Sequence, residues 1–151
     1  MAFSVLIGLY VFIGFVAAAG SACITRKLFS AKAEQIFFPL FLVAIAGFYL
    51  AFTAYFADQK AWRLETGGVI VSAIFGLVGA RLPVVLIIGY VLHGAWDVLH
   101  EIHAHGEVDL FGDQVTEFPL ASGAFCAAYD CCMAAYFYTR RSQWSAAWVG
   151  P

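Results

Sequence analysis

The stretch from Ala2 to Ile24, AFSVLIGLYVFIGFVAAAGSACI, contains no charged residue. About 20 predominantly apolar residues are enough for an α-helix to cross the hydrocarbon core of a bilayer. The rest of the chain has the same character, because 63% of its 151 residues are hydrophobic and only 12% are charged. A soluble domain is nearer to half apolar and a quarter charged. These proportions exclude an ordinary soluble domain and a disordered chain, and they predict an integral membrane protein.

Four further stretches are long and apolar enough to be spans. They cover about 36–57, 62–80, 83–105 and 120–139, and the third of them is rich in glycine. A proline stands near the start of three spans, where its missing N–H does no harm; these are Pro39, Pro83 and Pro119. The sequence therefore predicts an all-α fold, a single domain of residues 1–151 built as an integral membrane bundle of five transmembrane helices.

The eight basic residues predict how the bundle is oriented. Two of them, Lys60 and Arg63, fall on the side of the N-terminus, and six fall on the other side: Arg26, Lys27, Lys32, Arg81, Arg140 and Arg141. Basic residues remain on the cytoplasmic side of membrane proteins, so we expect the N-terminus outside and the C-terminus in the cytoplasm. The first span lacks the basic segment that precedes a signal peptide, and we expect it to stay uncleaved.

Charge and cysteine usage narrow the function further. A net charge of -2 provides no basic surface for nucleic acid. The four cysteines lie within or at the edges of predicted spans and not in oxidising loops, where a disulfide framework would need them. We therefore expect Cys23, Cys126, Cys131 and Cys132 to be small buried hydrophobic residues.

Ionisable residues concentrate in the span at 83–105, which contains all four histidines of the chain. His93, Asp97 and His100 are spaced i, i+4 and i+7, so they share one helix face. Glu101 borders the same face. Ionisable side chains are costly inside a membrane, so they indicate a functional site by default. The remaining two histidines lie near the outer end, where water can solvate them: His103 and His105.

Asp130 in the last span is the expected partner of this face. Asp97 lies eight residues from the outer end of its span and Asp130 ten residues from the start of the next, so both are roughly 12 to 15 Å deep. Spans that are joined by a moderate loop usually pack as antiparallel neighbours. Cys126 precedes Asp130 by four residues and shares its face. We therefore expect Asp130 to reach the height of Asp97 and His93.

No Lys or Arg is placed to neutralise these acids, so a divalent metal or protons must do so. Histidine with carboxylate suits zinc, iron or copper, and a catalytic zinc has three protein ligands and one open position. We predict a divalent ion, zinc before iron or copper, with catalytic roles for Asp97 and, as a proton shuttle, Glu101. The predicted ligands are His93, Asp97, His100 and Asp130. Two alternatives stay open, a proton- or ion-handling site and purely structural polar packing.

The patterns H-x-x-W-D-x-x-H at 93–100 and C-x-x-x-D at 126–130 resemble those of a family of small, uncharacterised bacterial integral membrane proteins. The similarity covers mainly the last two spans. Members often have a second histidine where this chain has Glu101. The resemblance implies the same pairing of motifs and a place in the bacterial inner (cell) membrane, and it implies no reaction.

Three functions compete at this point. The first is a metal-dependent enzyme of the hydrolase or oxygenase type, acting on a lipid-like or small periplasmic substrate from the outer leaflet. The second is a transporter or channel subunit that handles protons or cations. The third is an accessory subunit of a larger membrane complex, or a homo-oligomer. The inner halves of the first, second and fifth spans have tyrosines as their main polar groups, which favours a one-sided site over a conduit: Tyr10, Tyr49 and Tyr136.

Overall fold

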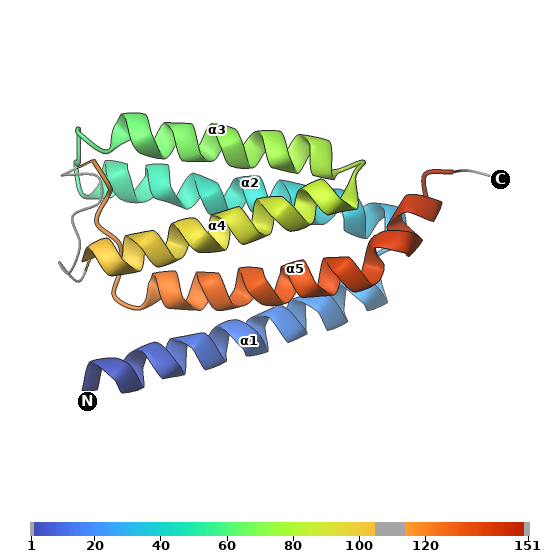
Figure 1. Cartoon of the computed structure of the whole chain (residues 1–151), viewed down its shortest axis with the longest axis horizontal. Coiled ribbons are helices and arrows are strands. Elements are labelled where there is room, and N and C mark those ends of the chain that lie inside the picture. Colours follow the sequence, from blue (N-terminus) through green and yellow to red (C-terminus); the bar gives the residue numbers. More distant parts are fainter. Residues whose placement is uncertain (1, 105–113, 150–151) are drawn as a thin grey trace.

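The computed structural model describes residues 2–104 and 114–149. Within these residues the chain forms five helices: α1 (Ala2–Leu28), α2 (Ala31–Tyr55), α3 (Trp62–Gly79), α4 (Pro83–Ala104) and α5 (Ser122–Ala146). Consecutive helices run in opposite directions, so the start of α1 and the end of α5 lie at opposite ends of the bundle (Figure 1). The predicted all-α fold is confirmed.

The helices pack in an order that differs from their order in the chain. α5 lies against both α1 and α4, and α3 lies against both α2 and α4 (Figure 1). α1 and α2 are consecutive but touch each other little. α5 therefore lies between α1 and α4, where it can cover polar side chains of both helices.

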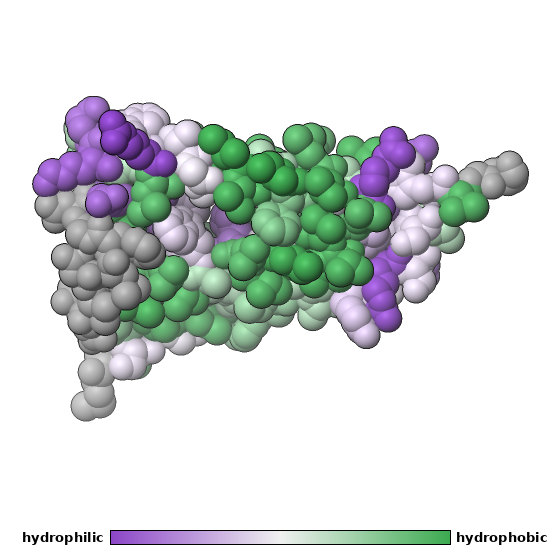
Figure 2. Space-filling model, turned by 45° about the horizontal axis from the view of Figure 1, so that its top comes forward, coloured by the Kyte–Doolittle hydropathy of each residue, from purple (hydrophilic) through white to green (hydrophobic). Residues whose placement is uncertain are grey.

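Four helices, α1 to α4, are long and apolar enough to cross a membrane, and α5 is not. We predicted a fifth span, but Asp130, Arg140, Arg141 and several tyrosines lower the mean hydropathy of α5. The helix still runs alongside α1 and α4, where protein covers Asp130 completely. The face shown in Figure 2 is mainly apolar in the middle and carries hydrophilic residues near both ends.

Two of the three prolines do not mark a helix start. α2 begins at Ala31, where Ser30 caps it by accepting a hydrogen bond from the backbone N–H of Ala33 at 3.2 Å, and Pro39 lies inside the helix. α5 begins three residues after Pro119, behind Ala121 in the left-handed region with φ 62°. Only Pro83 stands at a first helical position. Because α2 begins earlier than predicted, Glu34 and Gln35 belong to it and are buried.

Because consecutive helices run in opposite directions, the basic residues fall into two groups at opposite ends of the bundle, as predicted. Lys60 and Arg63 lie at the end where α1 begins, and the other six lie near the opposite end, where α1 and α3 end, α2 begins and α5 ends. This separation agrees with the count on which the orientation rests. The orientation itself stays a prediction, because no membrane is part of the structure.

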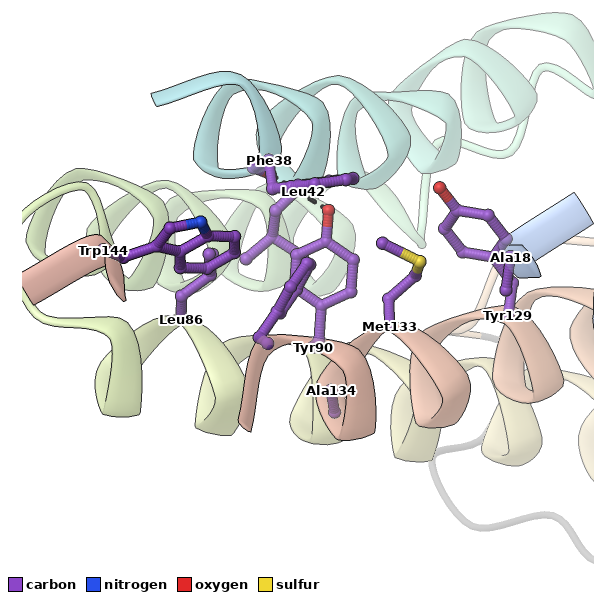
Figure 3. Packing of buried hydrophobic residues seen from close by; sticks show 10 residues of the cluster. Ala18, Phe38, Leu42, Leu86, Tyr90, Tyr129, Met133, Ala134 and Trp144 are labelled. Atoms are coloured by element: carbon purple, nitrogen blue, oxygen red, sulfur yellow. Dashed lines mark hydrogen bonds between the residues drawn. The ribbon is translucent and has the colours of Figure 1, made fainter. Parts of the chain in front are cut away.

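The apolar core fills the middle of the bundle between α2, α4 and α5. Figure 3 shows Trp144, Tyr90 and Met133 following one another along the bundle, with Phe38 and Leu42 of α2 packed over them. The Tyr90 hydroxyl donates a hydrogen bond to the backbone oxygen of Phe38 at 3.0 Å. These apolar side chains fill the middle of the interior.

The cysteines are not the buried residues that we expected. Cys23 and Cys131 are exposed on the helix surfaces, Cys126 and Cys132 are half-buried, and all four are free. An apolar surface suits a thiol as well as an apolar interior does, because free cysteine behaves as a small hydrophobic residue. The absence of a disulfide framework among them agrees with the sequence.

Candidate functional site

Three of the four predicted metal ligands converge. His93 and Asp97 from α4 and Asp130 from α5 are 5%, 1% and 0% exposed. His93 Nδ1 lies 2.7 Å from Asp130 Oδ2 and 3.2 Å from Asp97 Oδ2. One potential ligand atom from each residue lies within 4.8 Å of the others. The shared helix face and the matched depths of Asp97 and Asp130 are therefore confirmed.

Two glycines allow α4 and α5 to approach closely enough for this contact. A Cβ on Gly94 would lie 3.2 Å from the Cβ of Asp130, and one on Gly123 would lie 2.4 Å from the backbone oxygen of Asp97. Small residues at helix crossings let backbones come together in membrane bundles. Gly94 and Gly123 thus set the distance between the histidine on α4 and the carboxylate on α5.

Tyr49 of α2 is a member of the cluster that the sequence did not assign to it. Its hydroxyl donates a short hydrogen bond to Asp97 Oδ1. Tyr49, Asp97, His93 and Asp130 consequently form one continuous chain of polar contacts through three helices. In the sequence Tyr49 is one tyrosine among seven, and no spacing relates it to the motif on α4.

His100, the fourth predicted ligand, is buried in a separate pair. Its Nε2 lies 2.9 Å from Glu65 Oε1 and its Nδ1 lies 3.0 Å from the backbone oxygen of Trp96. Glu65 Oε1 also accepts the backbone N–H of Thr116 at 3.0 Å. The ring of Tyr49 contacts both histidine rings, with centroids 5.8 Å from His93 and 4.5 Å from His100. His100 shares the predicted face, but both of its nitrogens already have protein partners.

Glu101, predicted to be a proton shuttle, holds the start of α5. Its two carboxylate oxygens accept the backbone N–H groups of Ala121 at 3.0 Å and Gly123 at 2.9 Å. The first N–H groups of a helix have no partner within the helix, and a carboxylate there also matches the helix dipole. The contacts of Glu101 in the structure are thus those of a capping residue.

An elongated cavity adjoins the cluster between α2, α3 and α4. Its volume is about 420 Å³, and most of its lining is apolar. Tyr49 and His93 are among the lining residues. The Nε2 atom of His93 is buried and has no hydrogen-bond partner among the described residues. His93 therefore joins the carboxylates on one side to the cavity on the other.

The donor set suits a divalent ion. Two carboxylates and one imidazole are buried together, and no Lys or Arg among the described residues pairs with either acid. Asp97 Oδ2 and Asp130 Oδ1 are buried without a hydrogen-bond partner in the described part of the chain. Ligand atoms on a tetrahedral zinc ion are about 3.3 Å apart. The contacts of His93 with the two carboxylates, 2.7 and 3.2 Å, and the bound of 4.8 Å on all three ligand atoms bracket this value.

A family model for a family of unknown function (DUF6010) matches residues 9–143. The chain belongs to this family. The match covers most of the chain, including both the motif at 93–100 and Asp130, so the similarity is not confined to the last two spans. No curated protein and no solved structure matches the chain.

The DUF6010 match also covers a further buried carboxylate, which the sequence interpretation missed. Glu34 of α2 lies near the other end of the bundle and is 0% exposed. Its oxygens accept hydrogen bonds from side chains of α1 and α5: Thr25 at 3.1 Å, Tyr136 at short distance, Trp144 at 2.9 Å, and Arg140 through two nitrogens at 2.9 and 3.1 Å. At this end of the bundle α2 and α5 therefore hold a buried ion pair, whereas we had expected tyrosines to be the main polar groups there.

The described residues do not include every member of the predicted outer site. His105 lies outside them, as do Glu107, Asp109 and Asp113 of the acidic loop. His103 is half-buried near the end of α4 and, with Asp58 and Glu117, lines a second pocket of about 470 Å³ there. His103 thus lies apart from the buried cluster of this DUF6010 chain.

Proposed function

We propose that this protein is a membrane-embedded metal-binding protein in which His93, Asp97 and Asp130 hold a divalent ion, zinc in the first place. The observation that carries the proposal is the burial of two carboxylates and one histidine close together, with no lysine or arginine among the described residues paired with either acid. A buried carboxylate must be protonated or paired with a cation. A divalent ion would neutralise both acids and leave His93 neutral.

We further propose that the ion serves an enzymatic reaction on a molecule held in the adjoining cavity. A bound divalent ion polarises a substrate oxygen or activates water. The protein itself orients the ligands and excludes water. Tyr49 fixes the orientation of Asp97 through its hydrogen bond. The apolar wall of the cavity excludes water from the side of His93 that a substrate in the cavity would contact. Both a hydrolase and an oxygenase are compatible with this arrangement.

A proton- or cation-handling role is the second candidate. The continuous contacts from Tyr49 through Asp97 and His93 to Asp130 favour it, because such chains relay protons in membrane proteins. A conduit would have to continue past Tyr90, Met133 and Phe137, which are buried apolar packing. For this reason we rank the one-sided metal site first.

Metal analysis of protein purified without chelators and without a histidine tag tests the proposal. We expect close to one equivalent of a divalent ion in the wild-type protein and loss of most of it in His93→Ala and Asp130→Ala. His103→Ala is the matched control, because it removes a histidine of the same helix outside the cluster. Wild-type protein that is free of metal at neutral pH, or core variants with unchanged metal, would favour proton handling instead.

We also propose the orientation that the basic residues indicate, with the start of α1 outside and the end of α5 in the cytoplasm. The cluster then lies in the outer half of the membrane, within reach of a substrate from the outer leaflet. Protease access to the loop at 106–117 in intact spheroplasts is the expected result. Cleavage there only after lysis would reverse the orientation.

A further inference from the structure

The cavity beside the cluster opens toward the outside of the bundle. It is lined by α2, α3 and α4, and several of its α3 and α4 residues are exposed on the outside of the bundle, among them Gly67, Val71 and Leu92. The cavity therefore opens through the side of the bundle and not only at its end. Figure 2 looks toward the side on which α3 lies and shows a hollow within the surface there.

Contacts between α3 and α4 give the length of the cavity and the level of each group in it. Glu65 is level with His100, Gly68 with Trp96, and Phe75 with Gly89. On this register His93 is level with Val71. The lining of α3 extends from Arg63 to Phe75, which is about 18 Å along the helix axis, with His93 about 12 Å from the Arg63 end.

The two ends of the cavity differ in chemistry. Arg63 lies at the end nearer the membrane surface, and no carboxylate among the described residues pairs with it. The deep end is apolar and includes Ala46, Phe75 and Gly89. A guanidinium binds a carboxylate through two parallel hydrogen bonds. The lining is thus complementary to a molecule with an anionic head and a single apolar tail.

We propose that the cavity binds a fatty acid, with its carboxylate at Arg63 and its acyl chain extending inward past His93 to Phe75. This inference names the substrate class of the proposed enzyme, and it rests on the proposed function only in taking the cavity as the substrate site. His93, which lines the cavity, then lies beside the middle of the acyl chain and not beside its head.

The direct test is labelling with a fatty acid that has a photoreactive diazirine near its tail. The purified protein is irradiated with this probe in detergent, and the labelled peptides are identified by mass spectrometry. We expect the label on cavity residues such as Val71, Phe75 and Leu92, and we expect unlabelled fatty acid to compete at least tenfold better than the alcohol of equal chain length. Label spread evenly over the lipid-facing side of α1 overturns the proposal, and so does equal competition by the alcohol.

Two variants with matched controls locate the ligand without touching the metal cluster. Gly67→Leu fills the cavity where a Cβ meets nothing within 4 Å, and we expect it to reduce labelling at least tenfold. Gly8→Leu is the control, because Gly8 has equal space but lies on α1 outside the cavity. Arg63→Gln should abolish the preference for acid over alcohol, whereas Lys60→Gln, a change of charge at the same end but outside the cavity, should preserve it.

Metal content measured on the same samples separates this inference from the proposed function. If Gly67→Leu loses labelling and keeps its metal, both stand. If the wild-type protein is labelled in the cavity but contains no metal, the fatty-acid site stands and the metal proposal fails. If the protein contains metal and Gly67→Leu is labelled like the wild type, the metal proposal stands and the fatty-acid site is wrong.

Discussion

Two groups of buried acids lie toward opposite ends of the bundle, and they differ in their counter-charges and hydrogen-bond donors. Glu34 has Arg140 as its counter-charge and accepts hydrogen bonds from three further side chains. Asp97 and Asp130 share one histidine and one tyrosine, and two of their oxygens have no hydrogen-bond partner among the described residues.

The difference agrees with a structural role for the Glu34 network and with the functional role that we propose for the cluster. The Glu34 network is complete within the protein and ties α1, α2 and α5 together, so nothing external is needed for its charge. The cluster of His93, Asp97 and Asp130 is incomplete within the described chain, and it adjoins a cavity. A buried polar network that the protein leaves partly unsatisfied is costly, and it is retained where a proton, an ion or a substrate completes it.

Removal of Arg140 should produce the largest change in stability. Arg140→Gln leaves Glu34 buried without its counter-charge, and removing one partner of such a pair costs about 3–5 kcal/mol. Unfolding titrated with SDS in mixed micelles measures this loss, and metal content should not change. A loss below about 1 kcal/mol would show that the tyrosine, threonine and tryptophan donors alone stabilise Glu34.

A methyl group between α4 and α5 should have the next largest effect, and it should act on the other network. The Cβ of Gly123→Ala would lie 2.4 Å from the backbone oxygen of Asp97, so the two helices must separate. We expect about 1–3 kcal/mol lost to overpacking, together with a loss of bound metal. Gly20→Ala is the control, because nothing lies within 4 Å of its new Cβ. Unchanged metal content in Gly123→Ala would mean that the close approach is not needed for the site.

Removal of a single acid from the cluster should affect stability less than the loss of Arg140. Asp130→Asn keeps an oxygen that can accept the hydrogen bond from His93 Nδ1 and removes one of two neighbouring negative charges. We expect a stability change of about 1 kcal/mol or less when metal-free proteins are compared in the same titration. A loss as large as that of Arg140→Gln would mean that the cluster, like the Glu34 network, mainly stabilises the fold.

The smallest expected effect is that of Tyr49→Phe. The variant removes one hydroxyl and leaves the aromatic contacts with His93 and His100 in place. The expected cost is about 0.5 kcal/mol, the lower end for a single hydrogen bond, with weaker metal binding because Asp97 loses its orienting partner. Isothermal titration with zinc compares the affinities of this variant and the wild type. Equal affinity would leave Tyr49 as a packing residue only.

Local patterns in the sequence were enough to predict the helical bundle, the separation of basic residues between its ends, and the joint position of His93, Asp97 and Asp130. Each of these follows from a local property, such as the length of an apolar run, the position of a charge next to a run, or the spacing on one helix face. Depth along two antiparallel neighbours follows from counting residues, and this is why Asp130 could be matched to Asp97.

The partner of each polar group depends on how the helices pack, and local patterns did not predict it. His100 lies on the predicted face, yet it pairs with Glu65 of α3, and Tyr49 of α2 takes the place beside Asp97. Glu34 is buried because Thr25, Tyr136, Arg140 and Trp144 of two other helices meet it. Helix periodicity fixes directions within a single helix but not the rotation of one helix against another. That rotation is set by packing, here by the close approach of α4 and α5 at Gly94 and Gly123, and no local pattern encodes it.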